Sequence, residues 1–226
     1  ADLVGASMFG VENFCALTGD DVTAGDEKEA RRVFDLDGPQ LISVMTGISQ
    51  GNYLSGRKLR NEPHMFIGAV ENPTAPPLEY RVDRALKKVD AGAKFIQLQI
   101  CYQPEMLENF MRGCVLNGVS ERAALLPTVV FTKSARPLDF MDTSVPGISV
   151  PQAVIDRVAN SEDQAEESYQ LVKEQVIHAL GLPGVAGIHF TDFRHDGSLQ
   201  RVLQELGLGP KEHNRQPQED ASAYSS

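Results

Sequence analysis

The chain lacks tryptophan altogether, holds three cysteines, and is short of positive charge. Its 226 residues include 21 Lys+Arg against 31 Asp+Glu, a formal net charge of −10. Because phosphate backbones are bound by basic faces, this balance argues against nucleic acid as a partner. No apolar run approaches the roughly 18 residues of a membrane span. We therefore expect no membrane partner.

The cysteines are too few and too scattered for a disulfide framework. Cys15, Cys101 and Cys114 form no C-x-x-C pair and no cluster with histidine, so neither a zinc site nor any other metal site is predicted. Buried free thiols are the simplest interpretation, and they are typical of a reducing cytoplasm. The sequence thus favours a cytoplasmic location.

Short apolar runs alternate with amphipathic helical patterns along most of the chain. Gly38-Pro39 is a typical helix start, because proline in the first turn loses no hydrogen bond. The predicted strands are 13–17, 65–70, 94–100, 124–131 and 187–191. Helices are predicted from 38 to about 48, 78–91, 104–118, just after Pro151, 161–180 and 199–206, with a loop over 132–147. Strands separated by helices indicate parallel βαβ units.

Two architectures are compatible with this order, an open doubly wound sheet and a (β/α)₈ barrel. No G-x-G-x-x-G or G-x-x-x-x-G-K-[ST] follows a strand, so a common nucleotide-phosphate fingerprint is missing. Polar residues do gather where strands end, which is where a barrel builds its site. These residues are Asp20, Glu71, Asn72, Gln99, Lys133 and Asp192.

Several of these strand ends carry motifs that resemble one family. Leu17-Thr18-Gly19-Asp20 ends a strand, Asn72-Pro73 follows the next, and Lys87-Lys88-Val89-Asp90-Ala91-Gly92-Ala93 leads to Gln99. Together with the last strand Gly187-Ile188-His189-Phe190, this pattern resembles the methylenetetrahydrofolate reductases. The resemblance runs from about Leu3 to Leu208.

The resemblance implies an α/β fold, a (β/α)₈ TIM barrel of which this chain supplies about five of the eight strands. It implies a barrel domain over residues 1–208 that is incomplete at its N-terminal side, followed by a polar tail over 209–226. The implied reaction is flavin-dependent reduction of 5,10-methylenetetrahydrofolate to 5-methyltetrahydrofolate, in one-carbon and methionine metabolism. FAD would be the cofactor, NAD(P)H the electron donor, and folate the substrate.

The same resemblance assigns residues. Asp20 corresponds to an aspartate near the flavin that supports the cationic folate intermediate, so it is the predicted catalytic residue. Thr18 and Gly19 would lie against the flavin ring, Asn72 near the FAD, and Lys88 at its phosphates. Gln99 would contact the folate ring, and Phe131 or Phe140 would take the place of an aromatic that stacks on substrate.

Some readings stay open. The family's first-strand glutamate, a general acid, is not in this chain, and Arg81 stands where an acidic FAD contact is common. A flavin-free folate-dependent methyltransferase or demethylase, or a non-catalytic subunit of a multi-chain reductase, are the alternatives. The chain is expected to work either as a homo-oligomer or with an electron-donor protein, and the sequence does not choose between them. His189 inside a strand is interpreted as a structural histidine, and Asp192, Arg194 and His195 as either an anion site or a solvated loop.

Overall fold

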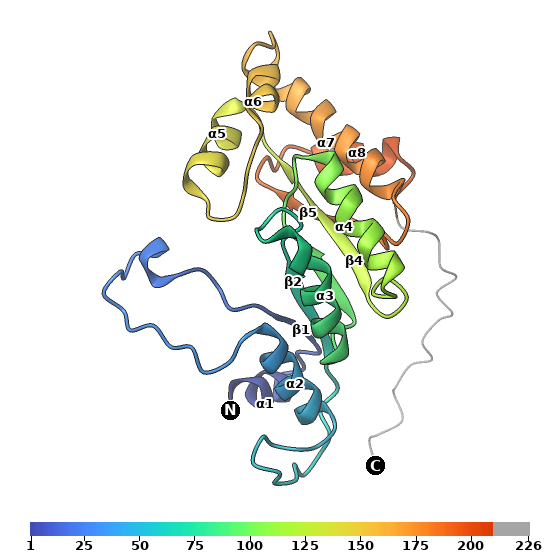
Figure 1. The fold of residues 1–226 in the computed structure, drawn as a ribbon. Coiled ribbons are helices and arrows are strands. Elements are labelled where there is room, and N and C mark those ends of the chain that lie inside the picture. Colours follow the sequence, from blue (N-terminus) through green and yellow to red (C-terminus); the bar gives the residue numbers. More distant parts are fainter. Residues whose placement is uncertain (210–226) are drawn as a thin grey trace, which may run out of the picture.

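Five parallel strands form one sheet in which spatial order equals chain order. The computed structural model describes residues 1–209 (Figure 1). The strands are β1 (Asn13–Ala16), β2 (Phe66–Glu71), β3 (Phe95–Leu98), β4 (Ala124–Phe131) and β5 (His189–Asp192). A doubly wound sheet reverses its strand order at a switch point, whereas a barrel adds each strand to the same edge. The observed order is therefore that of a barrel, which confirms the predicted α/β barrel-type fold.

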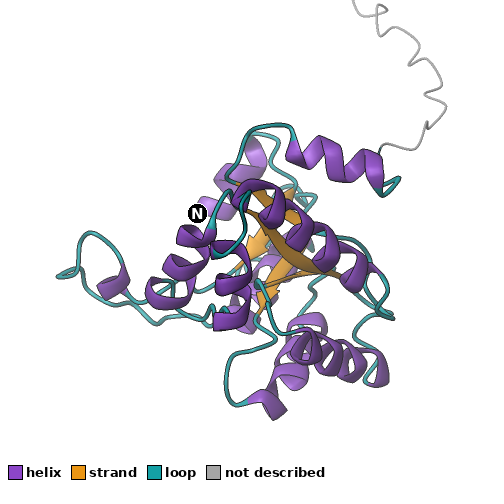
Figure 2. Cartoon of the chain, turned by 90° about the horizontal axis from the view of Figure 1, so that it is seen from above, coloured by secondary structure: helices purple, strands orange, loops and turns teal. Residues whose placement is uncertain are grey.

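Helices connect successive strands and surround the sheet, as the view from above shows (Figure 2). The α-helices are α1 (Asp2–Met8), α2 (Gly38–Ser49), α3 (Arg81–Asp90), α4 (Pro104–Leu116), α5 (Ala135–Ser144), α6 (Gln152–Ala159), α7 (Gln164–Leu180) and α8 (Ser198–Glu205). Short 3₁₀ turns are η1 (Val22–Ala24) and η2 (Leu78–Tyr80). Asp37 caps α2 in a capping box with Gln40, and Asp163 caps α7 by accepting from the Glu166 amide.

The main core lies between the helices and one face of the sheet. Strand residues Ala16, Ala69 and Leu98 are buried there against Met45 of α2 and Phe110 of α4. A second cluster packs the same face of β4 against α7 and α8. Because strand side chains alternate, every second residue points to the opposite side of the sheet, which we call the inner face.

The inner face carries Cys15, Gly68, Gln97, Thr128 and His189, one from each strand. Gly68 has a steric reason to be there, since a Cβ at this position would overlap the ring of Phe95. That ring stacks on Phe66 with 5.4 Å between centroids. The glycine thus lets an aromatic ring lie flat along the inner face.

One helix was missed in the sequence. The segment 132–147, predicted as a loop, contains α5. Its buried residues Ala135, Leu138 and Met141 recur at i, i+3 and i+6, and Pro137 stands in the first turn where it costs no hydrogen bond. This helical spacing is present in the sequence, but a segment with only three apolar residues among polar ones has the composition of a solvated loop.

The remaining differences are at element ends. The predicted helix 78–91 begins as the turn η2, and the predicted helix 161–180 starts at Gln164. Among the described residues no helix is long and apolar enough to cross a membrane. The predicted tail 209–226 falls outside the described residues from residue 210 onwards.

Candidate functional site

The carboxyl ends of the five strands bring most of the predicted site residues to one edge of the sheet (Figure 1). Gln99 follows β3, and its amide nitrogen donates to the Glu71 carbonyl oxygen at 2.8 Å, so the ladder between β2 and β3 continues to this residue. Its side-chain Oε1 accepts from the Ile100 amide at 3.0 Å. The Nε2 group has no partner within residues 1–209 and is available to a ligand.

Thr18, Gly19 and Asp20 leave the end of β1 in an exposed loop. Gly19 has a positive φ of 70°, a conformation that favours glycine, and nothing lies within 4 Å of the position its Cβ would take. The next residue, Asp21, is held by Arg32, with Nε 2.6 Å from Oδ2, and this hydrogen bond keeps the pKa of the Asp21 carboxyl well below its usual range. Asp20 has no such partner in the described part of the chain.

Asn72, predicted to lie near FAD, is engaged by the protein itself. Its Nδ2 donates to the Gly147 carbonyl oxygen at 2.7 Å, and its Oδ1 accepts from both the amide and the hydroxyl of Thr74 at 2.9 Å. The residue therefore ties the end of β2 to the connection between α5 and α6.

Lys88, predicted at the FAD phosphates, lies in the interior. Its ammonium is 2.6 Å from Oε2 of Glu71, and it also donates to the Val70 carbonyl oxygen. The two side chains are 7% and 2% exposed. Burial lowers the pKa of Lys88, and the adjacent Glu71 carboxylate opposes this effect. Arg81 adds a second ion pair to Glu71 at 3.2 Å.

These contacts test whether the chain fits FAD. A phosphate ligand must reach the solvent side of a cation, but the Lys88 ammonium is already covered and neutralised by Glu71. Lys88 therefore does not fit the phosphates of FAD in this arrangement. Arg84, half exposed on the same helix with Nε 3.8 Å from Glu71, is the more accessible cation.

Phe131, predicted to stack on substrate, points to the helix side of the sheet. It is 0% exposed and packs with Tyr169, Val172 and Val202. Val129 and Phe131 pack against α7 and α8, and because side chains alternate along a strand, Phe131 lies on the opposite face from Thr128. Its ring is part of the core, and a substrate contact there is not supported.

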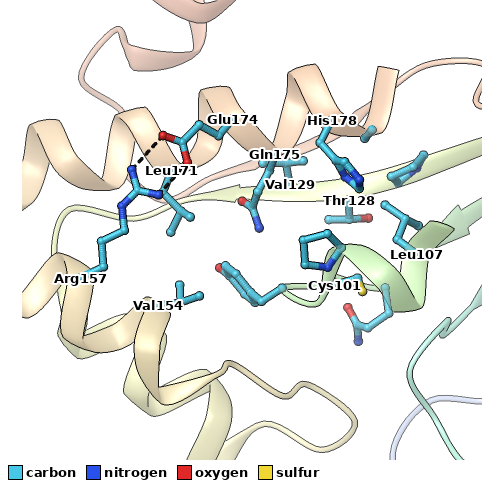
Figure 3. A pocket seen from close by; sticks show the side chains of 15 residues that line it. Cys101, Leu107, Thr128, Val129, Val154, Arg157, Leu171, Glu174, Gln175 and His178 are labelled. Atoms are coloured by element: carbon cyan, nitrogen blue, oxygen red, sulfur yellow. Dashed lines mark hydrogen bonds and ion pairs between the residues drawn. The ribbon is translucent and has the colours of Figure 1, made fainter. Parts of the chain in front are cut away.

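A cavity of about 340 Å³ lies beside β4, between α4, α6 and α7 (Figure 3). Arg157 and Glu174 form a two-point ion pair at one end, with N–O distances of 2.6 and 2.8 Å. At the other end His178 is 2.9 Å from Glu108. Gln99 and Thr128 also border this cavity. Its volume is at the small end of the range for ligand pockets.

The loop after β5 is held by its own charges. Asp192 accepts from the amides of Arg194 and His195, and the Arg194 guanidinium donates to the Ala165 carbonyl oxygen at 2.7 Å. Asp196 accepts from the Ser198 hydroxyl at 2.7 Å, and this hydrogen bond lowers the pKa of Asp196 to about 2. Arg194 is thus used to hold the loop, which favours a structural role over an anion site.

The three cysteines are free, and burial raises the pKa of each thiol, that of Cys114 to about 12. Over residues 1–209 no group of three metal-ligating side chains comes together. Glu71, the partner of three cations, was noted in the sequence only as a strand-end residue. The i, i+3, i+7 spacing of Arg81, Arg84 and Lys88 puts three cations on one side of a helix, but it does not show that Glu71 lies opposite them.

The family relation decides how these residues are interpreted. A family model for methylenetetrahydrofolate reductase matches residues 1–207. The chain belongs to the methylenetetrahydrofolate reductase family. This confirms the family resemblance predicted from the sequence.

Two curated relatives carry the same family name, and the match covers most of this chain but only part of each relative. "Methylenetetrahydrofolate reductase 2" of Schizosaccharomyces pombe is 26% identical over 214 residues, 90% of this chain and 32% of the relative. "Probable methylenetetrahydrofolate reductase (NADPH)" of Caenorhabditis elegans is 24% identical over 222 residues, 93% of this chain and 30% of the relative. The chain thus spans about a third of the length of these relatives.

One solved structure shares the fold. It is described as an uncharacterized protein from Clostridium thermocellum that binds two copies of 5-methyl-5,6,7,8-tetrahydrofolic acid. The TM-score is 0.54 at 16% identity, covering 85% of this chain and 69% of that one. At this identity the likeness concerns the fold.

Proposed function

We propose that this chain contributes the folate-binding side of an enzyme that reduces 5,10-methylenetetrahydrofolate to 5-methyltetrahydrofolate. The observation that carries the proposal is the family match over residues 1–207. The folate ligand of the Clostridium thermocellum protein supports the same substrate class. Gln99, just after the end of β3, supports it from the geometry, because its Nε2 has no partner among residues 1–209 and its Oε1 accepts only from the Ile100 amide.

The reaction breaks one carbon–nitrogen bond of the methylene bridge, adds a hydride to the carbon and adds a proton to the nitrogen released. A cationic, iminium-like carbon precedes hydride addition. The Asp20 carboxylate stabilises this cation by charge, because it is unpaired among the described residues and stands at a strand end. The Gln99 amide offers a donor and an acceptor to the pterin edge.

For the hydride source there are two candidates. FAD, reduced by NAD(P)H, is the donor expected of the family, with Thr18 and Gly19 flanking its ring. Lys88 is unavailable to its phosphates because Glu71 holds the ammonium. This one observation favours the second candidate, a flavin-free barrel that binds folate for methyl transfer or demethylation. A soluble cytoplasmic enzyme is part of the proposal in either case.

Two measurements on the purified protein test the proposal. The first is binding of 5-methyltetrahydrofolate together with turnover of 5,10-methylenetetrahydrofolate with NADH or NADPH. We expect binding, turnover, and a loss of at least tenfold in turnover in Asp20→Asn, with Asp26→Asn in the same loop as the matched control. Failure of the wild-type protein to bind the folate would overturn the proposal.

The second measurement is the flavin absorbance of the purified protein. A yellow protein with one flavin per chain supports the flavin-dependent reductase. A colourless protein that binds 5-methyltetrahydrofolate and gains no turnover on adding FAD selects the flavin-free candidate.

A further inference from the structure

The inner face holds a hydrogen-bonded pair of side chains that the reaction outlined above does not use. Oγ1 of Thr128 lies 3.1 Å from Nδ1 of His189. The two residues are directly paired in the register of β4 and β5, so both point to the same face of the sheet. Both are half-buried.

The second nitrogen of the His189 ring is free. Nε2 accepts or donates no hydrogen bond within residues 1–209, and it is not among the buried polar atoms that lack a partner. It is therefore open to solvent or to a ligand on the inner face. The contact with Thr128 therefore accounts for one ring nitrogen, and the other is accessible from the inner face, where a ligand can replace solvent.

Gln99 lies in the same cross-strand row. Leu98 pairs with Pro127, and one step further along the ladder brings Gln99 beside Thr128, which pairs with His189. Neighbouring strands are about 4.8 Å apart, so the row spans roughly 10 Å from Gln99 to His189. An amide, a hydroxyl and an imidazole thus stand at adjacent positions on three neighbouring strands.

We propose that His189 is a ligand contact that fixes the orientation of the pterin ring jointly with Gln99, and that Thr128 is the positioning residue for its imidazole. The inference rests on the proposed function. A hydroxyl that donates to Nδ1 leaves the proton on Nε2. Nε2 then donates to an acceptor on the pterin edge, a carbonyl oxygen or a ring nitrogen.

The affinity test uses the whole protein and 5-methyltetrahydrofolate. His189→Phe keeps the ring shape and removes the donor, and we expect about tenfold weaker binding, the loss of one hydrogen bond that leaves a buried partner unsatisfied. Thr128→Val keeps the shape of the hydroxyl side chain and frees the imidazole, with an expected loss of several-fold. His64→Gln, at an exposed position before β2 and 3.7 Å from Glu12, is the control and should bind as the wild type does.

A spectroscopic measurement distinguishes a ligand contact of His189 from a purely structural role. In protein labelled with ¹⁵N-histidine, the His189 signals are assigned by their loss in His189→Phe. Adding 5-methyltetrahydrofolate to the wild type should shift the Nε2 resonance, and in Thr128→Val the free protein should show a changed tautomer balance. If His189→Phe is unstable, His189→Asn provides the same assignment, so this measurement does not depend on a single variant.

The outcomes are distinct. Wild-type protein that does not bind the folate overturns the proposed function itself. Wild-type protein that binds while the Nε2 resonance stays in place, or while His189→Phe binds equally well, overturns this inference alone and leaves a structural Thr128–His189 pair.

Discussion

The ammonium of Lys88 lies 2.6 Å from a carboxylate oxygen of Glu71, and both side chains are buried between α3 and the end of β2. Arg81 approaches the other oxygen at 3.2 Å. The carboxylate is thus the common partner of charges that would otherwise repel one another. The geometry accounts for a lysine on a helix face that its sequence suggests is either solvated or bound to phosphate.

We expect Lys88→Met to destabilise the protein by about 3–5 kcal/mol, because removing one partner leaves the other charge buried without compensation. Lys87→Met, at the neighbouring exposed position, is the matched control and should be nearly neutral. Urea unfolding measures both. Equal midpoints for the two variants would show that the pair contributes nothing to stability.

Phe131→Ala tests whether that ring serves the core or the ligand. Because the ring is fully buried against α7 and α8, we expect a loss of about 3–5 kcal/mol in unfolding free energy. Folate affinity, measured on the folded fraction, should be unchanged. Phe140→Ala, 58% exposed on α5, serves as the control and should change stability little. A loss of folate binding in Phe131→Ala without a loss of stability would show that Phe131 contacts the ligand.

The sequence could reveal the strands because each is a short apolar run. The order of those runs fitted both an open doubly wound sheet and a barrel, and the family resemblance was needed to choose the barrel. It could not reveal that Phe131 and Gln99 face opposite sides of the sheet, since this depends on where β4 starts relative to β3. It could not place Lys88 either, because burial of a lysine depends on a carboxylate 17 residues away in sequence. Helix α5 was missed because its apolar face has only three residues, whereas α7 has six buried positions over 17 residues.

Asp196 predicts an acid dependence of stability. Its hydrogen bond from Ser198 lowers the carboxyl pKa to about 2, below the ordinary value of about 4. A carboxyl whose pKa is depressed on folding stabilises the protein above its unfolded pKa, and this contribution is lost as the pH falls through the folded value. Thermal unfolding should therefore show a contribution that is present above about pH 4 and gone near pH 2. Asp196→Asn should remove it.

The control for that experiment is Asp83→Asn, an exposed carboxylate on α3 with no hydrogen-bond or ion-pair partner in the described residues. Its melting curve should follow the wild type at every pH. If Asp196→Asn also follows the wild type between pH 4 and 2, the turn after β5 is held by backbone contacts rather than by the Asp196 carboxylate.

Gly68 predicts a steric effect on the inner face. A Cβ at this position would overlap the ring of Phe95, which stacks on Phe66. We expect Gly68→Ala to destabilise the protein by about 1–3 kcal/mol, the usual cost of overpacking. Phe95→Leu should tolerate the added methyl group better, so the double variant should be more stable than the sum of the single changes. Chemical denaturation of the four proteins in this cycle measures the coupling, and simple additivity would show that the ring moves aside without cost.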